Sequence, residues 1–226
     1  MSLQETLQKE YANRFSGLET YRDHVWQVLC GSFFNRYVRP GDTVIDVGAG
    51  YGEFIRNIQA GTKHALDLNP DTASSVSPDT RFHQQDCTHP WPIEAGSVDV
   101  VFTSNFLEHL PDKAAIERTL EHAWSSLKHD GTLICLGPNI RYVPGDYWDF
   151  WDHHVPISDG SLTELLAMKG FRVMQRIDRF LPNTMSGGSN PPIALVKLYL
   201  KLPFLWRIAG KQFLVIGQKT ESGAAL

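Results

Sequence analysis

A glycine-rich stretch, "VIDVGAGYGEF" at positions 44–54, contains the first residues whose types and spacing suit ligand binding. Its glycines occupy alternate positions directly after a short apolar run, so the backbone there can approach a ligand closely. A dinucleotide-binding loop would have a further glycine where this chain has Glu53, and a pyrophosphate would be repelled by Asp46 and Glu53. The two carboxylates instead favour a ligand with positive charge.

Further polar residues follow the next apolar runs and complete a binding site for such a ligand. The methionine part of S-adenosylmethionine (SAM) carries an ammonium group beside a sulfonium, which carboxylates attract. Asp67 lies in "ALDL", at the end of the next apolar run, and can accept hydrogen bonds from both ribose hydroxyls. Asp86 can accept one from the adenine amino group, while the Cys87 backbone amide contacts a ring nitrogen. With Asn105 at the same sheet edge, these positions predict one SAM cleft.

A second reactive stretch, "PNIRYVPGDYWDFWDHHVP" at positions 138–156, is rich in aromatic and acidic residues and has no apolar period. We predict that it forms the acceptor wall, with His154 slightly preferred over His153 as general base and an aspartate, Asp149 or Asp152, orienting the ring. Rings that can stack on an acceptor are Tyr142, Tyr147, Trp148 and Trp151. Two alternatives are a surface loop with structural histidines, and a divalent metal site whose spacing matches no strong pattern. We therefore predict no metal ligand.

The elements that must position these residues alternate along the chain. Seven short apolar runs predict strands: "TVIDVG", "KHALDL", "RFHQQD", "VDVVFTS", "GTLICLG", "FRVMQRI" and "KQFLVIG". Helical patterns lie between most of them, notably at 113–127, after the cap Asp112, and at 159–170, capped by Asp159 or Ser161. Alternating strands and helices predict a mostly parallel sheet covered on both faces, with ligands at the carboxyl ends of its strands.

In "VIDVGAGYGEF", "ALDLNP", "QQDC" and "VDVVFTSNFLEHL" the chain resembles class I SAM-dependent methyltransferases. The resemblance implies a Rossmann-like α/β fold with a seven-stranded sheet ordered 3-2-1-4-5-7-6, the last strand antiparallel. It also implies S-adenosylhomocysteine as product and a small-molecule acceptor. The SAM contacts expected from the motifs and the loop charge are Asp46, Gly48, Ala49, Gly50, Asp67, Leu68, Asp86, Cys87 and Asn105. His109, near a helix start, is expected to be structural.

The predicted domains are a helical extension or lid at 1–39, with two helices separated near Gly17, and a methyltransferase domain at 40–220. An amphipathic segment at 191–210 is inserted before the last strand, and its part 193–208 could serve as a lid, a dimer interface or a peripheral membrane contact. Together with the 138–156 stretch it resembles methyltransferases associated with bacterial surface polysaccharides. That likeness implies a glycan or polyprenyl-linked sugar as acceptor.

Composition sets the remaining expectations. The chain has 226 residues, a formal net charge of −4 and three well-separated cysteines, which predicts no nucleic-acid partner and reduced thiols in the cytoplasm, with the inner membrane face as an alternative location. Nothing at the start resembles a signal peptide. We predict a monomer or homodimer that methylates an oxygen of a small molecule or glycan. A non-catalytic SAM-fold binding protein is the second hypothesis, and a nicotinamide oxidoreductase the third.

Overall fold

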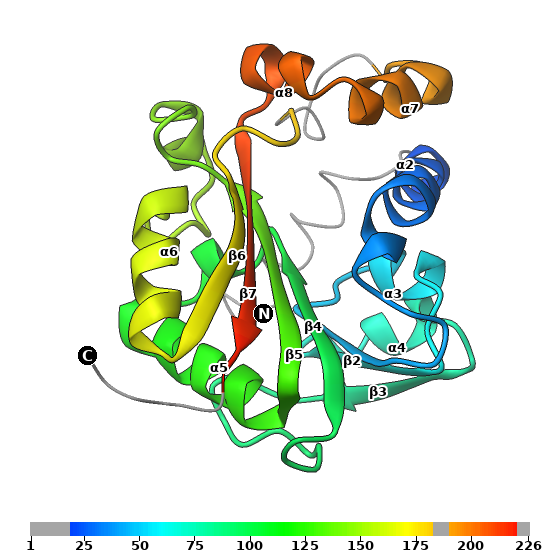
Figure 1. Cartoon of the computed structure of the whole chain (residues 1–226), viewed down its shortest axis with the longest axis vertical. Coiled ribbons are helices and arrows are strands. Elements are labelled where there is room, and N and C mark those ends of the chain that lie inside the picture. Colours follow the sequence, from blue (N-terminus) through cyan, green and yellow to red (C-terminus); the bar gives the residue numbers. More distant parts are fainter. Residues whose placement is uncertain (1–18, 183–189, 221–226) are drawn as a thin grey trace.

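The computed structural model of the protein describes residues 19–182 and 190–220 (Figure 1). A 7-stranded sheet has the order β3-β2-β1-β4-β5-β7-β6, and β7 is antiparallel to both of its neighbours. This confirms the predicted sheet order and the antiparallel last strand. The strands are β1 (Thr43–Val47), β2 (Thr62–Asp67), β3 (Thr80–Gln84), β4 (Val98–Ser104), β5 (Leu127–Pro138), β6 (Phe171–Ile177) and β7 (Gln212–Lys219).

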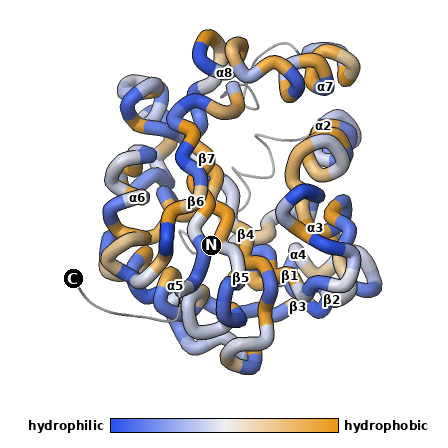
Figure 2. The backbone as a smooth tube through the Cα atoms, in the orientation of Figure 1, coloured by the Kyte–Doolittle hydropathy of each residue, from blue (hydrophilic) through white to orange (hydrophobic). Residues whose placement is uncertain are grey.

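Helices cover both faces of the sheet, with α2, α3 and α4 on one side and α5 and α6 on the other, while α7 and α8 cross one end (Figure 1). Their bounds are α2 Glu19–Ser32, α3 Glu53–Asn57, α4 Thr72–Ser75, α5 Lys113–Ser126, α6 Asp159–Met168, α7 Ile193–Lys201 and α8 Pro203–Ala209. The inner strands are apolar along most of their length (Figure 2). In β4, Val100 and Phe102 enter the core beneath α2, whereas Val101 enters the core beneath α5, as strand alternation requires.

An aromatic cluster fixes α2 against the sheet. The rings of Phe54 and Phe102 stack with centroids 3.5 Å apart, and Trp26 of α2 meets Phe102 edge to face at 5.9 Å. Phe34, in a short 3-10 turn after α2, contacts the same rings. Because large aromatic side chains bury much apolar area, this cluster holds the N-terminal helix beside the glycine loop.

The helix caps were predicted in part. Asp112 caps α5 as predicted, because its carboxylate accepts a hydrogen bond from the Ala115 amide at 2.7 Å. The prediction for α6 is wrong: Ser158 is the cap, in a reciprocal capping box with Ser161. Asp159 is fully buried instead and accepts hydrogen bonds from Arg176 and Asn139. Its carboxylate forms an ion pair with Arg176, whose side chain is 43% exposed.

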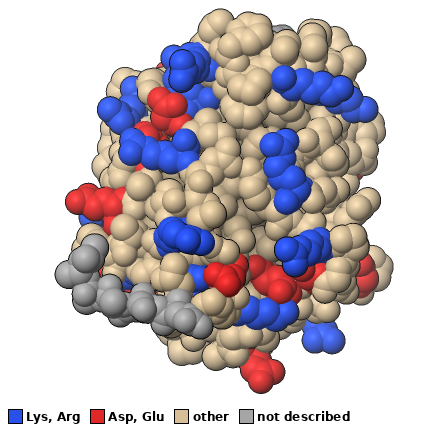
Figure 3. All heavy atoms as spheres, viewed as in Figure 1, with Lys and Arg blue, Asp and Glu red and all other residues tan. Residues whose placement is uncertain are grey.

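The ends of the chain and the inserted segment complete the molecule. The predicted first helix, before Gly17, lies outside the described residues. The connection between β6 and β7 contains α7 and α8, at the position predicted for an insertion. Within the described ranges, no helix is long and apolar enough to cross a membrane. On the face shown in Figure 3, Lys and Arg are scattered rather than gathered in one tract.

Candidate functional site

The glycine loop between β1 and α3 needs its glycines for shape. Gly48, Gly50 and Gly52 have φ of 70°, 53° and 68°, in the left-handed region that other residues rarely adopt. The Gly48 amide donates to the Leu66 carbonyl at 2.9 Å, and the Gly50 amide donates to Asp67 Oδ2 at 2.8 Å. The loop is therefore tied to the end of β2, and its backbone faces the carboxyl edge of the sheet.

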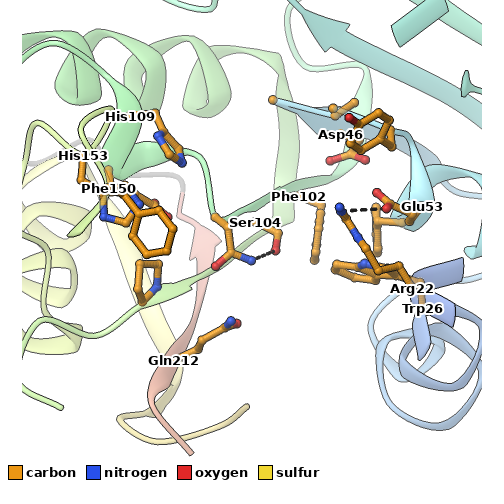
Figure 4. A pocket seen from close by; sticks show the side chains of 18 of the residues that line it. Arg22, Trp26, Asp46, Glu53, Phe102, Ser104, His109, Phe150, His153 and Gln212 are labelled. Atoms are coloured by element: carbon orange, nitrogen blue, oxygen red, sulfur yellow. Dashed lines mark hydrogen bonds and ion pairs between the residues drawn. The ribbon is translucent and has the colours of Figure 1, made fainter. Parts of the chain in front are cut away.

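A cavity of about 140 Å³ opens beside this loop. Figure 4 shows two groups of side chains across it: Arg22, Glu53 and Trp26 on one side, and His109, His153 and Phe150 on the other. Its wall also includes the predicted cofactor residues Asp46, Gly48, Ala49, Gly50 and Asn105. The structure thus brings together the loop from β1, the end of β4 and the segment after β5.

The Asp46 carboxylate gives the cavity its electrostatic character. Only 3% of the residue is exposed, and its pKa lies well above the ordinary value because of burial first and then the nearby Asp67 and Glu53 charges. A hydrogen bond from the Ile55 amide partly offsets these effects. Since a neighbouring cation favours an ionised carboxylate, a ligand with an ammonium group would relieve this penalty.

Arg22 joins the N-terminal helix to the same site. Its Nη2 lies 2.7 Å from Glu53 Oε1, and both side chains are only 9% exposed. The guanidinium also lies 5.4 Å from the centroid of the Tyr51 ring. Burial raises the pKa of Glu53, while Arg22 lowers it in part. The pair therefore places one positive and one negative group of the chain at the cavity.

The predicted ribose and adenine contacts lie outside this cavity, along the ends of β2 and β3. Asp67 accepts hydrogen bonds from the Gly50 and Asn69 amides, each at 2.8 Å. Leu68 is 48% exposed, and Asp86 accepts from the Thr88 amide at 2.8 Å. Cys87 is buried, and its Sγ lies 3.2 Å from Thr119 Oγ1. These roles in binding stay predictions.

A cluster of one carboxylate and two imidazoles forms the opposite wall. Glu108 and His109 belong to a 3-10 turn, Leu107–His109, just after β4, and His153 comes from the segment after β5. His109 Nδ1 lies 2.9 Å from the Asp152 carbonyl and 3.3 Å from Asp152 Oδ2. Desolvation lowers the pKa of His109, but Asp152 and Glu108 outweigh it and the net shift is upward. His109 is thus part of the cavity, whereas a structural role was expected.

The two candidate bases separate in space. His153 lines the cavity and packs against the rings of Tyr147 and Phe150 at centroid distances of 4.7 and 5.0 Å. His154 is exposed, and its backbone amide donates to the Glu108 carbonyl at 2.8 Å. The backbone bond from His154 to Glu108 thus accompanies different exposure of the two adjacent histidines. The slight preference for His154 therefore finds no support in this placement.

The four predicted acceptor rings also separate. Tyr147 is buried and borders the cavity, but its hydroxyl is bonded to the Val155 carbonyl at 2.5 Å. Tyr142 donates a short hydrogen bond to Asp178. Trp148 and Trp151 are 53% and 82% exposed. Of the four, only Tyr147 lines the cavity.

A second, mostly apolar cavity of about 330 Å³ lies between α2 and α7. It shares Arg22, Trp26, Asn105 and Gln212 with the first cavity, so the two adjoin. Gln212, at the start of β7, is 5% exposed, and its Oε1 is buried without a hydrogen-bond partner among the described residues. Figure 4 shows this side chain reaching toward the space between the two groups of cavity residues.

Comparison with known proteins decides the family. A family model described as a methyltransferase domain matches residues 19–176. The chain belongs to this methyltransferase family. A SAM-dependent methyltransferase from Archaeoglobus fulgidus has the same fold, with a TM-score of 0.66 at 18% identity over 89% of this chain and 97% of that one.

The curated relatives match only part of this chain and only part of their own length. A probable S-adenosylmethionine-dependent methyltransferase of Mycolicibacterium smegmatis is 27% identical over 146 residues, 62% of this chain and 56% of that protein. A ribosomal protein L11 methyltransferase of Staphylococcus carnosus is 29% identical over 126 residues, 51% of this chain. The matched part spans only 38% of that relative's length.

SAM is the cofactor of this family, and the site fits it. The left-handed glycine loop supplies the close backbone approach, and the buried Asp46 supplies a carboxylate whose burial cost a cation would reduce. Asp67 and Asp86 lie at the ends of the following strands, where the ribose and adenine are expected. The charge and backbone shape at the carboxyl edge of the sheet are thus compatible with a cationic ligand.

Sequence reasoning missed Arg22, Glu108 and Gln212. Arg22 and Gln212 lie far apart in the sequence and belong to no motif, so only the packing of α2 on the sheet brings them to one cavity. Glu108 stands beside His109 in "LEHL", and a paired acid and histidine at a strand end was a signal that could have marked it. Its burial beside His153 was not predictable from spacing.

Proposed function

We propose that this methyltransferase transfers the methyl group of SAM to a hydroxyl oxygen of an acceptor with an apolar portion, such as a lipid-linked sugar. The Gln212 side-chain oxygen carries the proposal, because it is buried without a partner where the polar and apolar cavities adjoin. A buried carbonyl oxygen favours a ligand that donates a hydrogen bond. The adjoining apolar cavity supports a hydrophobic body for the same ligand.

Different residues of the site would bind the two parts of SAM and the acceptor. Asp46 and the glycine loop would hold the methionine part of SAM, and Asp67, Leu68, Asp86, Cys87 and Asn105 its nucleoside part. When bound, SAM supplies an electrophilic methyl group on a positively charged sulfur. Trp26, Phe102 and Phe150 line the cavity and limit the access of water. His153 is the first candidate to accept the hydroxyl proton, because it borders the cavity.

Methyl transfer to fractionated cell extract tests the proposal. Purified protein and methyl-labelled SAM should label the organic-solvent extract, with a product that resists mild alkali as an ether does. Gln212→Met should lower kcat/KM for the acceptor by about 5- to 150-fold, equivalent to about 1–3 kcal/mol, without changing SAM affinity. Gln59→Met is the matched control, because Gln59 is exposed and lines neither cavity.

The other outcomes are equally informative. Label confined to water-soluble small molecules or to protein would contradict the lipid-linked acceptor. SAM binding by calorimetry without label in any fraction would favour the non-catalytic binding protein. Equal loss in the Gln212 and Gln59 variants would remove Gln212 from the acceptor site.

A further inference from the structure

We propose that Glu108, His109 and His153 bind one divalent transition-metal cation at the wall of the methyl-transfer cavity. One ligand atom from each of these residues lies within 4.8 Å of the others. This spacing is compact enough for all three atoms to meet one ion at bond lengths of about 2.0–2.2 Å after small side-chain rotations.

The second contact of His109 supports metal binding. Its Nδ1 is 2.9 Å from the Asp152 carbonyl oxygen, so the ring donates a hydrogen there and carries its lone pair on Nε2. Metal-binding histidines nearly always donate their other ring nitrogen to a carbonyl or carboxylate in this way. Asp152 Oδ2, at 3.3 Å, adds a carboxylate to the same side.

The backbone holds the three side chains in place. The Glu108 carbonyl accepts hydrogen bonds from the His154 and Val155 amides at 2.8 and 3.3 Å. These bonds tie the segment that carries His153 to the turn that carries Glu108 and His109. Because two ligands lie in one turn after β4 and the segment that carries the third is bonded to that turn, little ordering is needed when an ion binds.

The charge of Glu108 also favours a cation. The residue is 2% exposed, and within residues 19–182 and 190–220 no ion pair joins it to a lysine or arginine. A buried carboxylate costs free energy unless it is paired or coordinates a metal. Two imidazoles and one carboxylate suit zinc, manganese, iron(II) or cobalt better than magnesium or calcium, which prefer oxygen ligands.

Three protein ligands leave open coordination positions, as in catalytic rather than structural metal sites. All three line the cavity, so an acceptor hydroxyl could occupy an open position. There the O–H bond breaks, both electrons stay on oxygen, and the proton passes to water, because the ion lowers the hydroxyl pKa. In this form His153 is a ligand and not the base. Ion binding is independent of the proposed acceptor, whereas its use in catalysis rests on the proposed function.

Metal binding is measured on the full chain stripped with a chelator. Calorimetry and elemental analysis with Mn²⁺, Zn²⁺ and Co²⁺ should give one ion per chain, with Mg²⁺ much weaker. Glu108→Gln and His153→Gln should each weaken metal binding by more than about 10- to 100-fold. Losses of that size are typical when only a hydrogen-bond partner of a metal ligand is removed. Asp152→Asn, which removes the carboxylate charge 3.3 Å from His109 Nδ1 and leaves the backbone carbonyl in place, should fall in that range.

The matched control is His154→Gln, next in sequence but exposed. Far-ultraviolet circular dichroism and thermal melting establish that each variant is folded. No ion bound by the wild type, or equal loss in the His153 and His154 variants, would overturn the site. Unchanged turnover in verified ion-free protein would overturn its role in transfer and leave His153 as the base. Intact metal binding with no labelled product in any fraction would count against the proposed function alone.

Discussion

At the scale of single residues, the cavity is distinguished by polar side chains whose burial costs free energy. Asp46, Glu108 and Gln212 are each at most 5% exposed and all three face the cavity. Such groups are unfavourable in a folded protein unless a ligand or an ion satisfies them. Their presence at one place is what distinguishes the cavity from the rest of the core.

Asp46 provides a test with opposite effects on stability and binding. Well below the ordinary Asp pKa of about 3.9, the carboxyl is protonated in both folded and unfolded chains, so its burial has no pH-dependent cost. As pH rises, the unfolded chain ionises first because the folded-state pKa is raised, and the ligand-free protein loses stability. Asp46→Asn avoids this loss and keeps an acceptor for the Ile55 amide.

We therefore expect Asp46→Asn to melt at higher temperature than wild type near pH 7, by about 2–4 °C for each 1 kcal/mol relieved, and to match it near pH 3. SAM affinity should fall by about 1–3 kcal/mol because a charged hydrogen bond is removed. Calorimetric melting across pH and titration with SAM measure both effects. A variant that binds SAM as tightly as wild type would show that Asp46 does not contact the ligand.

At the scale of elements, the ion pair between α2 and α3 connects the N-terminal helix to the glycine loop. Arg22 and Glu53 are both 9% exposed and 2.7 Å apart. The Tyr21 hydroxyl of α2 also donates to the Pro191 carbonyl at 2.8 Å, just before α7. α2 therefore borders both cavities and contacts the segment inserted between β6 and β7.

Breaking this pair should cost much more than replacing it. Arg22→Met or Glu53→Gln alone leaves a buried group without its charged partner, and the free energy of unfolding should fall by about 3–5 kcal/mol. The double variant Arg22→Met, Glu53→Met should recover most of that loss, since apolar pairs of similar volume are tolerated. Urea unfolding measures all three. Single variants within about 1 kcal/mol of wild type would mean that the pair is screened like a surface pair.

At the scale of the whole molecule, α7 and α8 lie across one end of the sheet (Figure 1), and they carry exposed apolar side chains together with basic residues. Phe204 and Ile208 are 61% and 70% exposed, near Lys201 and Arg207 in sequence. Trp206 is instead buried, with its indole nitrogen bonded to the Tyr199 carbonyl at 2.9 Å. Exposed apolar side chains beside basic ones are typical of membrane-contact surfaces.

The membrane-contact hypothesis predicts that the wild type sediments with anionic phospholipid vesicles at low salt. Phe204→Ser with Ile208→Ser should reduce the bound fraction without changing SAM affinity, because neither side chain lines the cavities. Trp151→Ser, which removes another exposed aromatic from the segment after β5, is the control. If the wild type stays in the supernatant, or if the control loses as much binding, the surface has another role, such as a dimer interface.

The sequence by itself determined the strands and the edge of the sheet at which the cofactor is expected. Strands and helices follow from local apolar periodicity. The strand order that the structure has was implied by the resemblance of the motifs to class I SAM-dependent methyltransferases. The glycine loop could be predicted because few residues other than glycine adopt the left-handed backbone that the loop has after its strand. Asp46 and Asp67 could be placed at one edge because parallel strands end together.

Tertiary structure alone decided the acceptor side. Whether His153 or His154 faces the cavity depends on backbone bonds from His154 and Val155 to Glu108, which no local pattern encodes. Arg22 and Gln212 become neighbours of one cavity only when β7 inserts between β5 and β6 and α2 packs on the sheet. Local periodicity fixes which elements form, whereas the contacts between distant elements fix which side chains share a site.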